Sequence, residues 1–156
     1  MRGTLLLLAA VLIATLAAAE TMAASGASPL ALAKGQAARA TVTTNSSKYG
    51  RILFDGRGRA LYAFTHDPRG RSLCSGACAK AWPPYVVSAR ARAASGVRQS
   101  LLGTIRRANG SKQVTYRNRP LYYYIGDTKA GQVLCQNVTE FGGTWLVVRP
   151  NGQLVR

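Results

Sequence analysis

One short pattern occurs twice in this chain, and the repetition limits the folds open to it. The segment RALYAFTHD at 59–67 matches RPLYYYIGD at 119–127, with leucine, tyrosine and aspartate each offset by 60 residues. Further along, a cysteine, a tryptophan and a pair of valines recur at offsets of 61 to 63 residues. Repetition at a nearly fixed period indicates one supersecondary unit used more than once, whose copies bury a shared core. We therefore expect two homologous units packed into one domain.

Each copy predicts a β-hairpin. The stretches ILFDGRGRALYAF and VTYRNRPLYYYI place strand-forming residues on both sides of turn-forming ones. Successive side chains of a strand point to opposite faces, so Tyr62 and Phe64 should share one face. Leu61 and Ala63 should share the other, and residues 121–124 repeat this arrangement. Aromatic side chains on both faces predict a strand that is covered on both sides or paired at its edge.

The remaining segments complete a mainly β fold. CSGACAKAW predicts a short helix, which Pro83-Pro84 would end. PYVVSA and GTWLVVRPNGQLV predict closing strands, the second followed by an Asn-Gly turn. The predicted fold class is mainly β, with two homologous β-hairpin-containing repeats packed into one domain and at most a short helix near Cys74–Trp82.

The N-terminus has the pattern of an export signal. A basic tip, Met1-Arg2-Gly3, precedes an apolar run and small residues suited to cleavage. The run is shorter than the roughly 20 residues that span a bilayer, although retention as an anchor stays open. We expect a secreted or envelope protein with no transmembrane domain beyond this segment. The predicted divisions are a signal peptide (1–23), a linker with the first strand (24–47), repeat 1 (48–89), a basic connector (90–102) and repeat 2 (103–156).

The charge balance predicts anionic partners. The chain has 21 Lys and Arg residues against 5 Asp and Glu, a net charge of +16. Outside the cytoplasm such a field attracts polyanions, so anionic envelope polymers and lipid head groups are the expected partners. A nucleotide-composition bias in the genome would produce the same excess of arginine. The stretch TYRNRPLYYYIGDTK could stack rings on single-stranded nucleic acid, but strand alternation explains the same residues and nucleic acid is not an expected partner.

The repeated motif resembles that of a known family. YAFTHD at 62–67 and YYYIGD at 122–127 both satisfy the Tyr-x-(Phe/Trp/Tyr)-x-x-Asp pattern of the bacterial secreted-repeat family described as predicted lipoproteins. The resemblance covers roughly residues 48–156. It implies tandem repeats outside the cytoplasm and no particular reaction. The motif residues are Tyr62, Phe64, Asp67, Tyr122, Tyr124 and Asp127. No cysteine lies near the predicted cleavage site to accept a lipid.

The three cysteines predict a disulfide with one thiol left over. Cys74 and Cys78 would lie about 6 Å apart between Cα atoms on one helical face, within the range that a bridge tolerates. A bridge from either one to Cys135 would close a much longer loop and contribute about 4 kcal/mol, against about 2 kcal/mol for the local bridge. Loop entropy thus favours the long bridge, and the pairing stays open.

The alternative is a metal or redox site. Cys74, Cys78, Cys135 and His66 form a Cys₃His set suited to zinc or copper. The Cys-x-x-x-Cys spacing is looser than in common zinc sites, and a thioredoxin-like pair would need two intervening residues. Gly126 occupies the position of His66 in the second copy, which favours an ordinary strand-end histidine. We expect no cofactor, with copper or zinc as the alternative.

The two motif aspartates predict structure more than catalysis. Asp67 and Asp127 each precede a turn, where a carboxylate can accept backbone N–H bonds and close it. Acid–base catalysis would need both in one cleft, and the chain has only three other acidic residues. His66 would be the sole imidazole base, and no Gly-x-Ser-x-Gly motif exists. We expect an exported non-catalytic envelope or extracellular module that contacts anionic partners, the alternative being a metal-binding or redox accessory protein.

Overall fold

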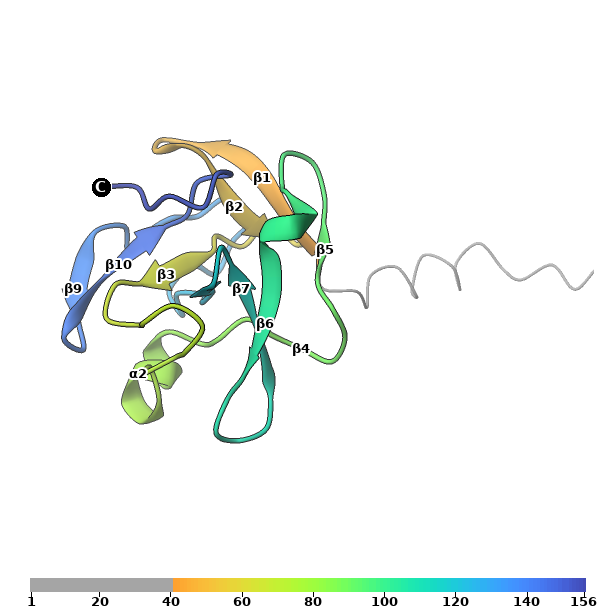
Figure 1. Cartoon of the computed structure of the whole chain (residues 1–156). Coiled ribbons are helices and arrows are strands. Elements are labelled where there is room, and N and C mark those ends of the chain that lie inside the picture. Colours follow the sequence, from red (N-terminus) through yellow and green to blue (C-terminus); the bar gives the residue numbers. More distant parts are fainter. Residues whose placement is uncertain (1–40) are drawn as a thin grey trace, which may run out of the picture.

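The structure is a computed structural model that describes residues 41–156 (Figure 1). The predicted signal peptide and most of the predicted linker lie outside these residues. The strands are β1 (Thr41–Ser47), β2 (Gly50–Asp55), β3 (Tyr62–Phe64), β4 (Val86–Val87), β5 (Arg92–Ala93), β6 (Leu102–Arg106), β7 (Lys112–Tyr116), β8 (Arg119–Pro120), β9 (Val138–Glu140) and β10 (Gly143–Val147). The helical elements are α2 (Gly76–Ala81) and the 3₁₀ turn η1 (Gln99–Leu101). The mainly β class with a short helix near Cys74–Trp82 is confirmed.

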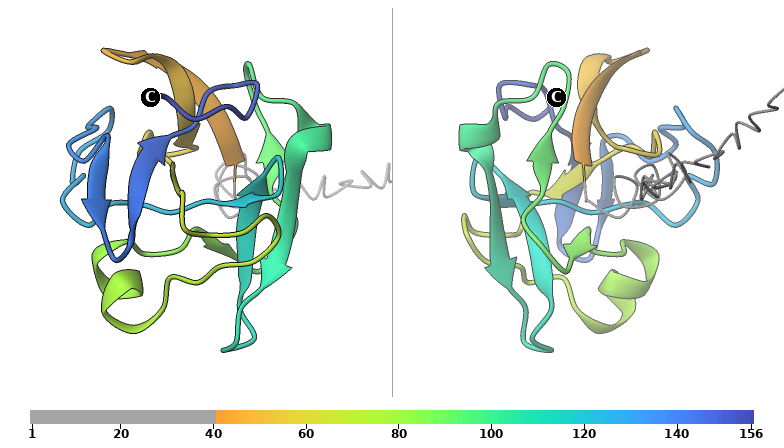
Figure 2. Two further views of the ribbon diagram at one scale, coloured as in Figure 1. Left: turned by 60° about the vertical axis from the view of Figure 1, so that its left-hand side comes forward. Right: turned by 90° about the vertical axis from the view of Figure 1, so that its right-hand side faces the viewer.

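The strands form three small sheets. Their orders are β2-β1-β5, β3-β10-β9 and β4-β7-β6, with β8 added to β7. All pairings between these strands are antiparallel except that of β1 with β5. The sheets that contain β10 and β7 lie on opposite sides of the molecule (Figure 2). No helix in the described part of the chain is long and apolar enough to cross a membrane.

Both predicted hairpins are present. In the first, the Leu61 N–H donates to the Leu53 carbonyl at 3.0 Å; in the second, the Leu121 N–H donates to the Val114 carbonyl at 2.9 Å. The second hairpin turns through Arg117-Asn118, whose φ angles are 50° and 60°. A two-residue turn with positive φ at both positions matches the twist of its flanking strands, and asparagine adopts that conformation more readily than most residues.

The two repeats exchange their closing strands. Strand β10 from the second repeat pairs with β3 of the first, in the register Val147↔Tyr62. Strand β4 from the first repeat pairs with β7 of the second, in the register Val86↔Gln113. Figure 1 shows β3 and β10 side by side although they are far apart in the sequence. Neither repeat therefore completes its own sheet.

The motif strands occupy the centre, where the two copies meet. Tyr62 and Tyr122 donate N–H bonds to each other's carbonyl oxygens, both at 2.9 Å. Their side chains belong to one apolar cluster, which also contains Phe64, while Leu61 and Leu121 belong to a second cluster. The predicted coverage of both strand faces is confirmed, because one core lies on each side.

The connector between the repeats is part of a sheet. We expected residues 90–102 to be exposed, and Arg90, Arg92 and Arg98 are. Ala91 between them is only 2% exposed, and β5 pairs in parallel with β1. Small residues at alternate positions let this segment lie against the body while its arginines face solvent.

Candidate functional site

The motif tyrosines and aspartates form crossed pairs between the repeats. The Tyr62 hydroxyl donates to Asp127 Oδ2 at 2.7 Å, and the Tyr122 hydroxyl donates to Asp67 Oδ2 at 2.5 Å. Asp67 is 8% exposed and Asp127 is 2% exposed. Each copy of the motif therefore supplies the tyrosine that satisfies the aspartate of the other copy.

The second oxygen of each aspartate accepts a backbone N–H. Asp67 Oδ1 accepts from Leu73 at 2.7 Å, and Asp127 Oδ1 accepts from Leu134 at 3.0 Å. The expected carboxylate–amide bonds are present, but the donors lie six and seven residues downstream. The sequence analysis placed them in the adjacent turn, and that detail was wrong. Each aspartate thus fastens a whole loop to the core.

Burial sets the protonation behaviour of these groups. It raises the pKa of Asp67, while the bonds from the Leu73 N–H and the Tyr122 hydroxyl lower it in part. Burial, reinforced by the aspartate partner, also raises the pKa of both Tyr62 and Tyr122 above its ordinary value. The tyrosines therefore remain hydrogen-bond donors, and the four side chains form two crossed pairs that hold the repeats together.

Next to these pairs lies a column of aromatic rings, which sequence reasoning missed. Three rings stack in the order Phe64, Trp145, Trp82, with centroid separations of 4.2 and 4.0 Å, and the ring of Tyr124 follows at 4.8 Å, tilted by 41°. Tyr62 and Tyr122 meet the two indoles edge-on at 5.3 and 5.1 Å. The recurrence of tryptophan at an offset of 63 residues was the available signal. Stacked and edge-to-face rings each contribute about 0.5–1.5 kcal/mol beyond their buried area.

The cysteines form the local disulfide. Cys74 and Cys78 are bonded, with their Cα atoms 5.3 Å apart, and Cys135 is free. The long bridge that loop entropy favours is not formed. Entropy of the unfolded chain can select only between pairs that the native fold brings together, and α2 places Cys78 one turn from Cys74. Burial raises the pKa of the Cys135 thiol, and the neighbouring Tyr124 hydroxyl lowers it in part.

The geometry gives no support to the Cys₃His alternative. The sulfurs of Cys74 and Cys78 are bonded to each other, so neither is a thiolate ligand. His66 is exposed, and its ring lies 5.8 Å from that of Phe64. Within residues 41–156, no three His, Cys, Asp or Glu side chains gather closely enough to hold a metal ion.

Charge is sorted between the inside and the surface. Asp55 is buried like the motif aspartates. Its Oδ1 accepts hydrogen bonds from the backbone N–H groups of Arg57 and Arg59, and its Oδ2 accepts one from the Tyr123 hydroxyl. Glu140 is the exposed acidic residue of the described part, and it accepts a bond from the Trp82 indole at 3.0 Å. No Lys or Arg of residues 41–156 is buried. The surface is therefore almost uniformly positive.

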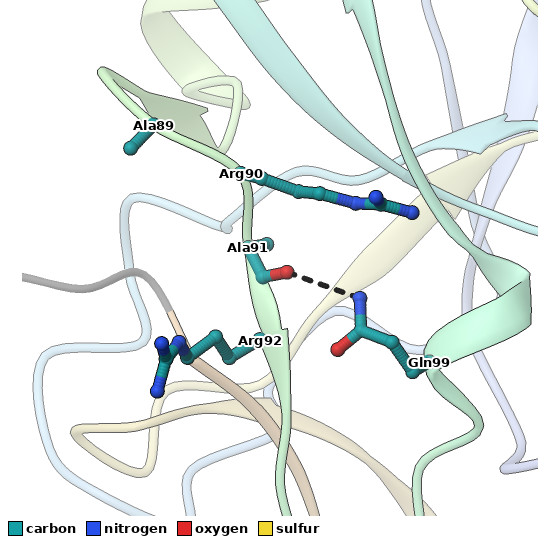
Figure 3. Close-up of a pocket in the computed structure, with 5 residues that line it drawn as sticks. All are labelled: Ala89, Arg90, Ala91, Arg92 and Gln99. Atoms are coloured by element: carbon teal, nitrogen blue, oxygen red, sulfur yellow. Dashed lines mark hydrogen bonds between the residues drawn. The ribbon is translucent and has the colours of Figure 1, made fainter.

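A pocket of about 500 Å³ lies in the connector (Figure 3). Its lining residues are Ala89, Arg90, Ala91, Arg92 and Gln99. The Gln99 side chain donates to the Ala91 carbonyl at 3.3 Å and accepts the Ala93 N–H at 2.8 Å, which supports β5 as a strand neighbour would. Figure 3 shows Arg90 and Arg92 extending to opposite sides of the strand. The pocket is basic, but its two guanidinium groups do not converge.

Comparison with known proteins agrees with the repeat geometry. A family model described as a secreted repeat of unknown function matches residues 43–85 and 103–149. These two segments correspond to the two copies that exchange strands. No curated protein and no solved structure matches the chain.

Proposed function

The chain belongs to the family of secreted repeats of unknown function, which places it outside the cytoplasm, and on that basis we propose that it is a non-catalytic envelope module that binds anionic polymers. The proposal names a partner class and a mode of action. The binding surface is the positive exterior of the two-repeat body, and the crossed tyrosine–aspartate pairs supply its rigidity.

The observation that carries this proposal is the sorting of charge. The carboxylates of Asp55, Asp67 and Asp127 are buried and accept hydrogen bonds within the protein. None of the basic residues in the described part is buried. A surface of one sign raises the local concentration of oppositely charged partners and speeds their association. Polyanions also gain entropy when binding releases their condensed counterions.

The motif carboxylates and tyrosines are not placed for acid–base catalysis, and this favours a binding role. A general acid or base must reach the proton that it transfers. Both oxygens of Asp67 and of Asp127 accept hydrogen bonds from donors of the protein itself, and the tyrosine hydroxyls keep their protons as two of these donors. These side chains hold the backbone in place, so we assign the proposed polymer binding to the surface of the protein.

Direct binding measurements test the proposal. The purified protein would be titrated calorimetrically with poly(glycerol phosphate), with neutral dextran as the matched control. We expect binding to the polyanion only, with affinity falling on the order of tenfold between about 50 and about 200 mM salt, as for about two neutralised phosphates. No binding at low salt, or equal binding to dextran, would contradict it.

A further inference from the structure

Three segments distant in the sequence meet beside the turn between β7 and β8. Arg69 Nη1 donates to the Arg117 carbonyl at 2.9 Å, and the Gly70 N–H donates to the Asn118 carbonyl at 2.7 Å. From the other side, Arg117 Nη1 donates to the Asn151 carbonyl at 3.3 Å. Both neighbouring segments are thus fastened to the same turn, and the arginines that they carry are held near each other.

The approach of the C-terminal segment is unusually close. A Cβ at Gly152 would lie 2.8 Å from the Cβ of Arg117, and Gly152 has a φ of 79°. Both facts require glycine at this position. The Tyr116 hydroxyl adds a bond to the Pro150 carbonyl at 2.7 Å. The fold therefore constrains this region in detail.

Arg119, in β8 beside the turn, has a guanidinium group without an acceptor. Its Nε is buried and has no hydrogen-bond partner among the described residues. A buried donor left unpaired is costly, and a bound ion or ligand is one way in which proteins satisfy such a group. Arg119 as a whole is half-buried, so an anion from solvent can approach the exposed part of the residue.

The charges around Arg119 are positive. Burial lowers the pKa of its guanidinium, and the charges of Arg69, Arg117 and Arg156 lower it further. In residues 41–156, none of these four arginines donates a hydrogen bond to a carboxylate. Folding has therefore gathered like charges at an electrostatic cost that a bound anion would remove.

We propose that Arg69, Arg117 and Arg119, here called the arginine cluster, bind a phosphate group of an anionic envelope polymer. This inference rests on the proposed function and adds the site and the ligand chemistry. A guanidinium group presents paired N–H donors that match the spacing of phosphate oxygens. The ammonium group of lysine does not offer such a pair. Donors that two segments bring to the same turn can reach several oxygens of one tetrahedral group.

A polymer fits this site better than a lipid surface does. Proteins that dock on membranes combine basic residues with apolar side chains that enter the interface. Within residues 41–156 the large exposed apolar residues are Leu73, Val86, Ile125, Leu134 and Phe141. None of them lies in segments 69–71, 117–119 or 149–156, so the face offers charge without an apolar anchor.

The test compares two variants that lose the same charge. Arg69→Gln/Arg119→Gln alters the arginine cluster, and Arg90→Gln/Arg92→Gln alters the connector pocket, whose guanidinium groups diverge. Each would be titrated with poly(glycerol phosphate), inorganic phosphate and phosphatidylglycerol vesicles. We expect the cluster variant to lose about tenfold in affinity for the polymer and the connector variant about twofold, since only the first removes direct charged hydrogen bonds.

A second readout separates this inference from the proposed function. Inorganic phosphate should shift the Nε–Hε resonance of Arg119 in the wild-type protein and should raise its Tm, and the cluster variant, which lacks that resonance, should show no rise in Tm. Equal losses of polymer affinity in both variants would overturn the site and leave the proposed function standing. No polymer binding by the wild type would overturn the proposed function, and vesicle binding in its place would overturn the polymer as ligand.

The cluster variant must be shown to fold. The stacked tryptophans should give a near-ultraviolet circular dichroism signal, which serves as the check. If Arg119→Gln loses that signal, the single variant Arg69→Gln, whose side chain is exposed, carries the same expectation of weaker polymer binding. Retention of full affinity by a folded Arg69→Gln would then count against the site.

Discussion

At the scale of single residues, each motif aspartate links two parts of the fold, because each of its two oxygens accepts a hydrogen bond. One oxygen accepts a tyrosine hydroxyl from the opposite repeat, and the other accepts a backbone N–H from its own loop. A buried carboxylate is stable only when its oxygens are bonded in this way. Tyrosine and aspartate therefore recur together in the motif. The aspartate of each copy needs the hydroxyl donor that the tyrosine of the other copy supplies.

Removal of one donor should be costly. Tyr62→Phe leaves Asp127 Oδ2 buried without its hydroxyl donor, and we expect the free energy of unfolding to fall by about 2 kcal/mol, as for hydrogen bonds to charged groups. Urea denaturation followed by tryptophan fluorescence measures it. Tyr49→Phe, which removes a hydroxyl outside the network, should change stability by less than about 0.5 kcal/mol. Similar small values for both variants would show that the crossed pair contributes little.

The raised pKa of Asp67 predicts a dependence of stability on pH. Because its pKa in the folded state lies above the ordinary value of 3.8, the folded protein binds this proton more tightly than the unfolded chain does. Asp67 therefore costs stability at neutral pH, and the cost is relieved as pH falls through the folded pKa. Relative to Asp67→Asn, wild-type stability should rise as pH is lowered towards 3.8. Denaturant titrations over that range test the sign, and a falling difference would refute it.

At the scale of elements, α2 depends on cross-links. Six residues are too few for a stable isolated helix. The Cys74–Cys78 bridge ties α2 to the residue before its N-cap, Ser75, and Arg107 Nη2 donates to the Cys74 carbonyl at 2.6 Å. Trp82 directly follows the helix and lies within the aromatic column. The bridge therefore helps to orient an indole at the centre of the molecule.

Loss of the bridge should lower stability without abolishing the fold. Cys74→Ala/Cys78→Ala should reduce the free energy of unfolding by about 2 kcal/mol, the value for a short closed loop. Thiol titration of the unreduced, denatured wild-type protein should find only Cys135 reactive. The variant Cys135→Ala keeps the bridge and serves as the control, with no reactive thiol. More than one reactive thiol in the wild type would contradict the pairing.

At the scale of the whole molecule, the two repeats are interlocked. Strand β10 completes the sheet of the first repeat and β4 completes that of the second. The two sheets lie on opposite sides of the body and are joined through the motif strands (Figure 2). Since each core is built from both halves, neither repeat has a complete core alone.

Separated halves should not fold independently. Fragments 41–100 and 101–156 each lack a strand that the other contains, so each should be unfolded by near-ultraviolet circular dichroism and amide exchange. An equimolar mixture should regain the native aromatic signal, because the exchanged strands can pair between chains. A folded spectrum from either fragment alone would show that the exchange is not required.

Much of the fold was predictable from the sequence, and the features that were not predicted share one cause. The hairpins, the two-faced motif strands and the short helix follow from periodicity and turn residues that lie within a few positions of each other. The sequence also predicted aspartates bonded to backbone amides, although it placed the donors too close. It did not predict that Tyr62 serves Asp127, that the tryptophans stack, or that the arginine cluster forms, since each joins residues from separate segments.

The duplication, the strand pattern, the excess of basic residues and the relationship to secreted repeats can all be read from the sequence, because they depend on composition and on residues close together in the chain. The exchange of closing strands, the local disulfide and the burial of the aspartates became known from the folded structure. Those outcomes depend on which distant surfaces can pack together with every buried polar group satisfied, and that condition applies to the whole chain at once.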